Sequence, residues 1–219
     1  MAEQAEAMRA TVASMLRGIE RYNPENISTL ERYVELQARE NTYDLEANLA
    51  LLKLYQFNPG TYQSNVACQI LMKALTNLPH TDFVLCKCLL GQDQMEDKNI
   101  KRIMYLHDLL EMCQFRTFWK DKVQYADLMN NIKDFNDSIR KYICHVITIT
   151  YQHIEKTVLS QLLGNIDESA MLAWMNKYGW KDTEDEYVFV ANQEETVKTK
   201  NITEKIEFDS VAGIMAACR

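Results

Sequence analysis

Residues 43–57 read Tyr43-Asp-Leu-Glu-Ala-Asn-Leu-Ala-Leu-Leu-Lys-Leu-Tyr-Gln-Phe57. At the period of an α-helix, Leu45, Leu49, Leu52 and Tyr55 fall on one side of this segment, and Leu51 and Leu54 fall on the other. A helix that is apolar nearly all round has to be covered on two sides. The inner helices of stacked helical pairs are covered in this way. The segment therefore predicts a layered, mostly α-helical fold.

Helical spacing of apolar residues continues on both sides of this segment. On the N-terminal side, Asn23-Pro24-Glu25 has the pattern of a helix start with proline at its first position. On the C-terminal side, Asn58-Pro59-Gly60 is a stop signal. The helical stretches that we predict here cover residues 3–20, 27–37, 43–57, 66–78, 81–90, 103–113 and 115–126. They indicate a helical-repeat (HEAT-like) domain at residues 1–130, built from short antiparallel helices without a strict repeat period.

The pattern changes after residue 130. A long helix is expected at residues 135–154, followed by a helix at 154–162 and a third that Asp167 caps and Gly179 ends. Strand-like segments follow at Tyr187–Val190 and Thr196–Thr199, with a polar turn between them. Helices followed by a two-stranded ribbon are the element order of a winged helix. We therefore predict a long helix and winged-helix domain at residues 131–205 and a C-terminal tail helix at residues 206–219.

Composition agrees with a helical, water-soluble protein. The 219 residues include only six glycines and three prolines, the residues that helix interiors exclude. The acidic N-terminus lacks the apolar core of a signal peptide, and no apolar run is long enough to span a membrane. The six cysteines fall within helical patterns, which favours buried thiols in a reducing compartment.

One group of residues resembles a metal site. Cys86 and Cys88 lie close in sequence to His80 and His107. Two residues that are two positions apart on a helix, however, point about 200° away from each other. Structural zinc sites also need a second pair of ligands at a suitable spacing. The spacing therefore favours buried structural thiols, and we predict no metal and no cofactor.

The sequence contains none of the common catalytic motifs. It has no glycine-rich phosphate loop, no G-x-S-x-G elbow and no H-E-x-x-H pair. The acidic run Asp182–Glu186 favours a solvated turn, because paired catalytic carboxylates need environments that split their pKa values. We predict a protein that is not an enzyme, with no catalytic residues and no small-molecule substrate.

A winged helix often binds DNA, but the charge of this segment disfavours that role. Residues 152–205 contain ten acidic and six basic residues, and the whole chain has a net charge of −7. Lys198, Lys200 and Lys205 form the only basic cluster here, and weak RNA contact by these lysines stays open. Protein docking is the preferred interpretation. Its interface candidates are Trp180, Tyr187 and Phe189, and the alternative is that these rings fill the core beneath the wing.

Several sequence blocks resemble the k subunits of the eukaryotic translation initiation factor three complex, a PCI-type family. The resemblance extends over essentially the whole chain and is weakest in the first dozen residues and at residues 121–131. The blocks are Arg21-Tyr-Asn-Pro-Glu-Asn26, Leu52-Lys-Leu-Tyr-Gln-Phe-Asn-Pro59, Lys73-Ala-Leu-Thr-Asn-Leu-Pro-His-Thr-Asp-Phe83, Ile149-Thr-Tyr-Gln-His-Ile-Glu155, Lys177-Tyr-Gly-Trp180 and Lys200-Asn-Ile through Phe208-Asp-Ser-Val211.

The resemblance implies a helical-repeat segment stacked on a winged helix. It also implies a cytoplasmic, non-catalytic scaffold, with a fraction in the nucleus allowed. Its implied partners are the other subunits of that complex, notably those lettered l and e, and through the complex the small ribosomal subunit. Two alternatives stay open: a PCI subunit of another assembly, such as the proteasome lid or the COP9 signalosome, and a nucleic-acid-binding winged-helix protein.

Overall fold

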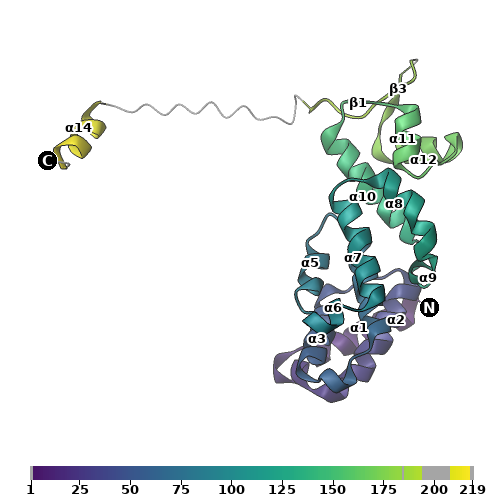
Figure 1. The fold of residues 1–219 in the computed structure, drawn as a ribbon, viewed down its shortest axis with the longest axis vertical. Helices are drawn as coiled ribbons and strands as arrows, with labels where there is room; N and C mark the ends of the chain where they lie inside the picture. The colour runs from purple at the N-terminus through teal and green to yellow at the C-terminus, as the bar shows by residue number, and fades with distance from the viewer. Residues whose placement is uncertain (1, 184, 194–207, 218–219) are drawn as a thin grey trace.

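Helix α3, Leu45–Phe57, is enclosed by its neighbours as its sequence predicts. Its buried residues are Ala47, Asn48, Ala50, Leu51, Leu52, Leu54 and Tyr55, which lie on more than one side of the helix. α2, Ile27–Glu40, packs on one side and α5, Asp82–Lys87, packs on another. The computed structural model describes residues 2–183, 185–193 and 208–217, and it shows a mostly helical, elongated body (Figure 1).

The N-terminal part of the body is a stack of short helices, coloured purple to teal in Figure 1. α2 lies against α1, α3 and α4, and α7 connects α4 to α8. Side chains cap the N-termini of two of these helices. Asn23 accepts a hydrogen bond from Glu25 N at the start of η2, and Asp44 accepts one from Ala47 N at the start of α3. The elements not yet given are α1 Ala2–Met15, η1 Gly18–Tyr22, η2 Pro24–Asn26, η3 Pro59–Thr61, α4 Ser64–Leu75, α6 Gln92–Met95, α7 Lys98–Glu111, α8 Phe115–Asp121, η4 Lys122–Tyr125 and α9 Ala126–Met129.

Several of the expected helices have other bounds in the structure. The stretch expected at 3–20 is divided into α1 and η1, and the one expected at 66–78 ends at Leu75. Residues 91–99, which lie between the helices expected at 81–90 and 103–113, contain α6 and the first two residues of α7. The Gln94 side chain accepts a hydrogen bond from Gly91 N at 3.0 Å, a polar contact that starts α6. The helix expected at 115–126 is divided into α8, η4 and α9, and the one expected at 81–90 ends at Lys87. Apolar spacing located these helices but did not determine where each one ended.

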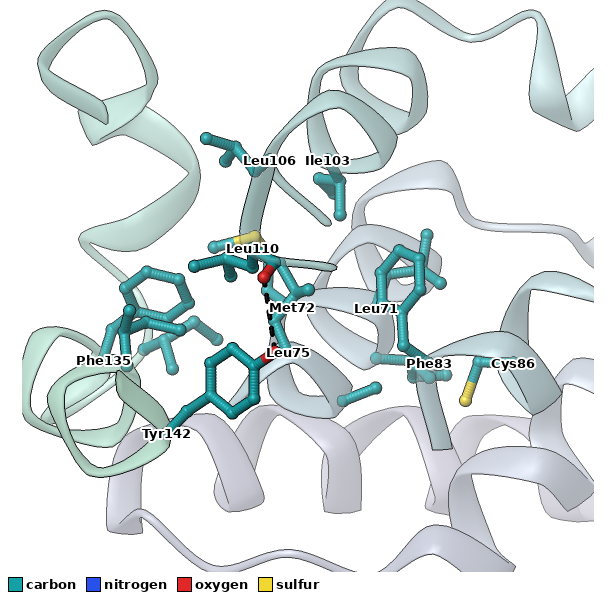
Figure 2. Packing of buried hydrophobic residues seen from close by; sticks show 14 of the residues in the cluster. Leu71, Met72, Leu75, Phe83, Cys86, Ile103, Leu106, Leu110, Phe135 and Tyr142 are labelled. Atoms are coloured by element: carbon teal, nitrogen blue, oxygen red, sulfur yellow. Dashed lines mark hydrogen bonds between the residues drawn. The ribbon is translucent and has the colours of Figure 1, made fainter. Parts of the chain in front are cut away.

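A continuous apolar core joins the helical stack to the segment that follows it. Figure 2 shows Met72 and Leu75 of α4 near Leu110 of α7 and Tyr142 of α10, Phe135–Thr150, while Leu71 lies near Phe83. The Tyr142 hydroxyl donates a hydrogen bond to Leu110 O at 3.3 Å (Figure 2). Full burial of each aliphatic side chain contributes about 1.5–3 kcal/mol to stability. The boundaries proposed at residues 130 and 205 stay predictions.

The C-terminal part contains a small antiparallel sheet with two helices. Its strands are β1 His153–Glu155, β2 Lys181–Asp182 and β3 Tyr187–Phe189, in the order β1-β3-β2. α11 Lys156–Leu162 and α12 Glu168–Tyr178 stand between β1 and β2 in the chain. Asp167 caps α12 through Ala170 N, and Gly179 ends it with a φ of 71°, as expected. The expected tail helix is α14 Phe208–Ala217.

The strand predictions were partly wrong. The long helix ends at Thr150, and residues 153–155, expected to be helical, form β1. β3 confirms the strand expected at Tyr187–Val190, but its two neighbours are β1 and β2. The ribbon is therefore formed by β2, which ends at Asp182, and β3, which begins at Tyr187. The segment Thr196–Thr199, expected to pair with β3, lies outside the described residues.

Candidate protein interface

The central strand β3 has one buried and one outward face. Val188 is fully buried, whereas Tyr187 is 49% exposed and Phe189 is half-buried. Successive side chains of a strand point to opposite faces of the sheet. Tyr187 and Phe189 therefore share the face that points away from the helices.

Residues of both edge strands complete this outward face. Phe189 lies opposite His153 of β1 and Lys181 of β2, and Tyr187 lies opposite Glu155. The His153 and Phe189 rings are 5.1 Å apart at an interplanar angle of 60°. We call His153, Glu155, Lys181, Tyr187 and Phe189 the sheet face. It contains the Tyr187 and Phe189 rings, which are residue types enriched in protein–protein interfaces, together with charged residues of both signs.

Hydrogen bonds fix the sheet in place. Val190 N donates to Gln152 O at 2.9 Å, and Lys156 N donates to Glu186 O at 2.9 Å. The Lys156 ammonium also lies 2.6 Å from Asp182 Oδ1, which ties the start of α11 to β2. These contacts hold the aromatic residues of the sheet face on ordered backbone rather than on a free loop.

Trp180 does not belong to this face. It is only 5% exposed, and its ring lies 5.5 Å from that of Tyr178. The Tyr178 hydroxyl in turn donates to Lys141 O of α10 at 3.4 Å. The three interface candidates therefore divide: Tyr187 and Phe189 lie on the sheet face, and the burial of Trp180 favours the core role for that residue.

α12, the last helix before β2, offers few side chains that could recognise DNA bases. Its exposed side chains include one acid, Glu168, one base, Lys177, one amide, Asn176, and the apolar Leu172. The Lys177 ammonium lies 4.7 Å from the centre of the Trp174 ring. Base-reading helices present several Arg, Lys, Asn or Gln side chains. Lys198, Lys200 and Lys205 lie outside the described residues, so their hypothesis of weak RNA contact stays a prediction.

A basic hollow is a feature that the sequence interpretation missed. It has a volume of about 450 Å³ and is lined by Arg116, Trp119, Lys120, Lys122, Gln161, Gly164 and Asn165. Lys122 and Arg140 both approach the Trp119 ring, at 4.5 and 5.3 Å from its centre. The i, i+4 spacing of Arg116 and Lys120 was the only local signal. The other residues come together only through packing of α8 and η4 against the end of α11 and the residues that follow it.

The three buried cysteines of the described chain, Cys68, Cys86 and Cys144, are poorly suited to nucleophilic chemistry. Burial raises the pKa of the Cys86 and Cys144 thiols to about 12 and that of Cys68 to about 11. A thiol with such a pKa is protonated at neutral pH and therefore weakly reactive. Cys86 is buried and Cys88 is exposed, so these two do not face one site. Among the described helices, none is both long and apolar enough to cross a membrane.

Comparison with known proteins agrees with this architecture. The model of the CSN8/PSMD8/EIF3K family matches residues 61–201. Subunit K of eukaryotic translation initiation factor 3 from Xenopus laevis is 59% identical over 212 residues, which cover 97% of each chain. The human subunit is 58% identical and the Bombyx mori subunit 57% identical, again over 97% of each chain. The chain belongs to the CSN8/PSMD8/EIF3K family, and its relatives along nearly the whole length are subunits K of eukaryotic translation initiation factor 3.

Proposed function

We propose that this chain is a non-catalytic scaffold subunit of translation initiation factor 3. It supports assembly of the initiation machinery on the small ribosomal subunit through protein–protein contacts. Its direct partners are other subunits of that factor, notably those lettered l and e. It works in the cytoplasm, with a fraction in the nucleus.

The observation that supports this proposal most strongly is the similarity to subunits K over 97% of the chain. The family model alone does not separate the initiation factor from the lid or signalosome assemblies, because its name includes subunits of all three kinds. The matches at 57–59% identity over 97% of the chain favour the initiation factor.

The sheet face adds a physical reason for a binding role. Tyr187 is half exposed on an ordered strand, at a position where a partner can cover it. Tyrosine buries a large area on binding at a low entropic cost. The net charge of −7 opposes binding to a nucleic-acid backbone and does not oppose binding to a protein. Taken together, charge and surface favour protein docking over a stand-alone nucleic-acid role.

Affinity purification tests this proposal. The full chain with a C-terminal tag is expressed in cells of its own organism, and the cytosolic complexes are purified and identified by mass spectrometry. We expect the other subunits of initiation factor 3, those lettered l and e among them, and small-subunit ribosomal proteins that are lost at high salt. A tag fused to an unrelated acidic helical protein is the control.

The alternative assemblies give different results. Recovery of proteasome-lid or signalosome subunits in place of initiation factor subunits would assign the chain to another PCI complex. Recovery of nucleic acid with no protein partner would favour the nucleic-acid-binding alternative. Either result contradicts the proposed function.

A further inference from the structure

Three potential metal ligands lie together in the last turn of α7. His107, Asp108 and Glu111 each offer one ligand atom, and these atoms lie within 4.8 Å of one another. His107 and Glu111 are four residues apart, so their side chains lie one above the other on the same side of the helix. This group differs from the Cys86 and Cys88 pattern considered above, because all its ligands come from α7 and none is a thiol.

The His107 ring is fixed in position and lacks a partner at one nitrogen. It stacks on Phe83 of α5, with ring centres 4.0 Å apart and an interplanar angle of 10°. The side chain is only 7% exposed, and its Nδ1 atom has no hydrogen-bond partner among the described residues. An unpaired buried nitrogen destabilises the folded state. The unpaired Nδ1 atom of His107 therefore indicates a ligand that binds there.

The distances within the group fit a shared ion better than direct hydrogen bonds. Nδ1 lies 3.5 Å from Asp108 Oδ1 and 3.7 Å from Glu111 Oε2. Hydrogen bonds between such atoms are normally about 2.7–3.2 Å long. Two ligands bound to one tetrahedral zinc ion, at about 2.0–2.1 Å each, are about 3.3 Å apart. The carboxylates are 54% and 67% exposed, so small rotations can bring their oxygens to this spacing.

The local charge also favours a cation. In the described chain, neither Asp108 nor Glu111 pairs with a lysine or an arginine. Both lie at the C-terminal end of α7, where the helix dipole is negative. Two carboxylates and a helix C-terminus therefore surround the unpaired imidazole nitrogen.

We propose that His107 Nδ1, Asp108 and Glu111 bind a divalent transition-metal ion of the zinc class. One nitrogen and two oxygen ligands suit zinc and its neighbours, and the imidazole disfavours calcium and magnesium. Three protein ligands leave one position of a tetrahedral ion to water. The site links α7 to α5 through the Phe83–His107 stack. The inference does not depend on the proposed function.

Calorimetric titration with Zn²⁺ tests the site. The full chain carries Cys88→Ser and Cys113→Ser, because these exposed thiols could bind zinc themselves. We expect one Zn²⁺ per chain. Glu111→Gln and Asp108→Asn should each weaken binding by about tenfold or more, since each removes a charged ligand. Both positions are exposed, so these variants should fold normally.

The matched control is Glu35→Gln, which removes an exposed carboxylate from α2 and should leave Zn²⁺ binding unchanged. Titration with Co²⁺ gives a second measurement, because nitrogen and oxygen ligands produce visible absorption without the charge-transfer band of a thiolate. His107→Gln should remove that absorption. The proposal is wrong if the background chain does not bind Zn²⁺. It is also wrong if Glu111→Gln and Asp108→Asn bind Zn²⁺ with the same affinity as the background chain.

Discussion

Gln37 and Asn48 exchange side-chain hydrogen bonds inside the helical stack. Gln37 Nε2 donates to Asn48 Oδ1 at 2.9 Å, and Asn48 Nδ2 donates to Gln37 Oε1 at 3.3 Å. Gln37 Oε1 also accepts from Asp44 N at 2.8 Å. Both side chains are almost fully buried, so this pair connects α2, the loop that follows it and α3 with polar contacts inside an apolar core.

Gln37→Leu should destabilise the protein by roughly 3 kcal/mol, because it leaves Asn48 and the Asp44 amide buried without partners. The double variant with Asn48→Leu should cost less than the sum of the two single changes, by about 1 kcal/mol or more. Urea denaturation of the four proteins measures this coupling. Gln56→Leu, at an exposed position of α3, is the control and should change little. Additive costs would mean that the two amides act independently.

This pair shows what the sequence could and could not predict. Gln37 follows Leu30 and Val34 at helical spacing, so periodicity predicts that it is covered, but nothing local indicates that Asn48 faces it. Periodicity reports which side of a helix is covered and not which polar group lies opposite. The fold class could be predicted from such patterns, because nearly every helix either has one apolar stripe or is apolar nearly all round.

Three features that the sequence did not predict depend on contacts between distant segments. β1 has three residues, and its strand conformation comes from pairing with β3 rather than from its own alternation. The basic hollow combines side chains from α8, η4 and the end of α11. For the interface candidates, sequence alone left the core and surface roles open for all three rings. Only burial in the folded chain separates Trp180, 5% exposed, from Tyr187, 49% exposed.

Gly164 and Gly179 offer a matched test of close packing. Both have positive φ, 93° and 71°, so alanine is strained at either position. A Cβ at Gly164 would lie 2.8 Å from Trp119 Cδ2, whereas one at Gly179 would meet no atom within 4 Å. Trp119 cannot easily move, because its Nε1 donates to Leu162 O at 2.7 Å.

Gly179→Ala should therefore cost about 1 kcal/mol from backbone strain alone. Gly164→Ala should cost roughly 2 kcal/mol more, because the ring of Trp119 or the α11–α12 loop has to shift. Thermal denaturation compares the two, and Trp119→Phe in the Gly164→Ala background should recover part of the loss. Equal costs for the two glycine changes would show that Trp119 adapts freely.

Lys73 is a buried base whose stability effect depends on pH. It is 1% exposed, and its Nζ lies 3.3 Å from Asn41 Oδ1. Burial lowers the Lys73 pKa from 10.5 to about 8, partly opposed by the charge of Asp134. Between these two pKa values the unfolded chain binds more protons than the folded chain. This group therefore makes stability rise as pH increases from about 8 to 10.5, and its penalty is fully present below pH 8.

Lys73→Met should stabilise the protein at pH 7 by roughly 2 kcal/mol, since it keeps the volume and removes the buried charge. The difference between the two proteins should shrink as pH rises towards 10.5. Urea denaturation at several pH values measures both effects, and Lys120→Met, at an exposed position of α8, is the control. A destabilised Lys73→Met protein, with a difference that does not vary with pH, would mean that the bond to Asn41 outweighs the cost of burial.

The last prediction separates the two aromatic roles at the sheet. Trp180→Ala should lower the free energy of unfolding by about 3–5 kcal/mol, because this ring is buried. Tyr187→Ala should leave stability within about 0.5 kcal/mol and weaken binding to the subunit lettered l by about 2 kcal/mol or more, which is roughly a 30-fold rise in Kd. Tyr22→Ala is the matched control, because Tyr22 is 50% exposed in η1, far from the sheet in sequence, and should affect neither property.

Phe189→Ala should fall between these cases, since Phe189 is half-buried against His153. Unfolding is followed by circular dichroism, and binding by co-purification and titration with the purified subunit. Lys198→Glu with Lys200→Glu should spare assembly, because we assign docking to aromatic rather than basic side chains. If this charge reversal abolishes assembly while Tyr187→Ala preserves it, docking is electrostatic and the sheet face is not the interface. If Tyr187→Ala reduces stability and binding together, Tyr187 supports the fold instead of contacting the partner.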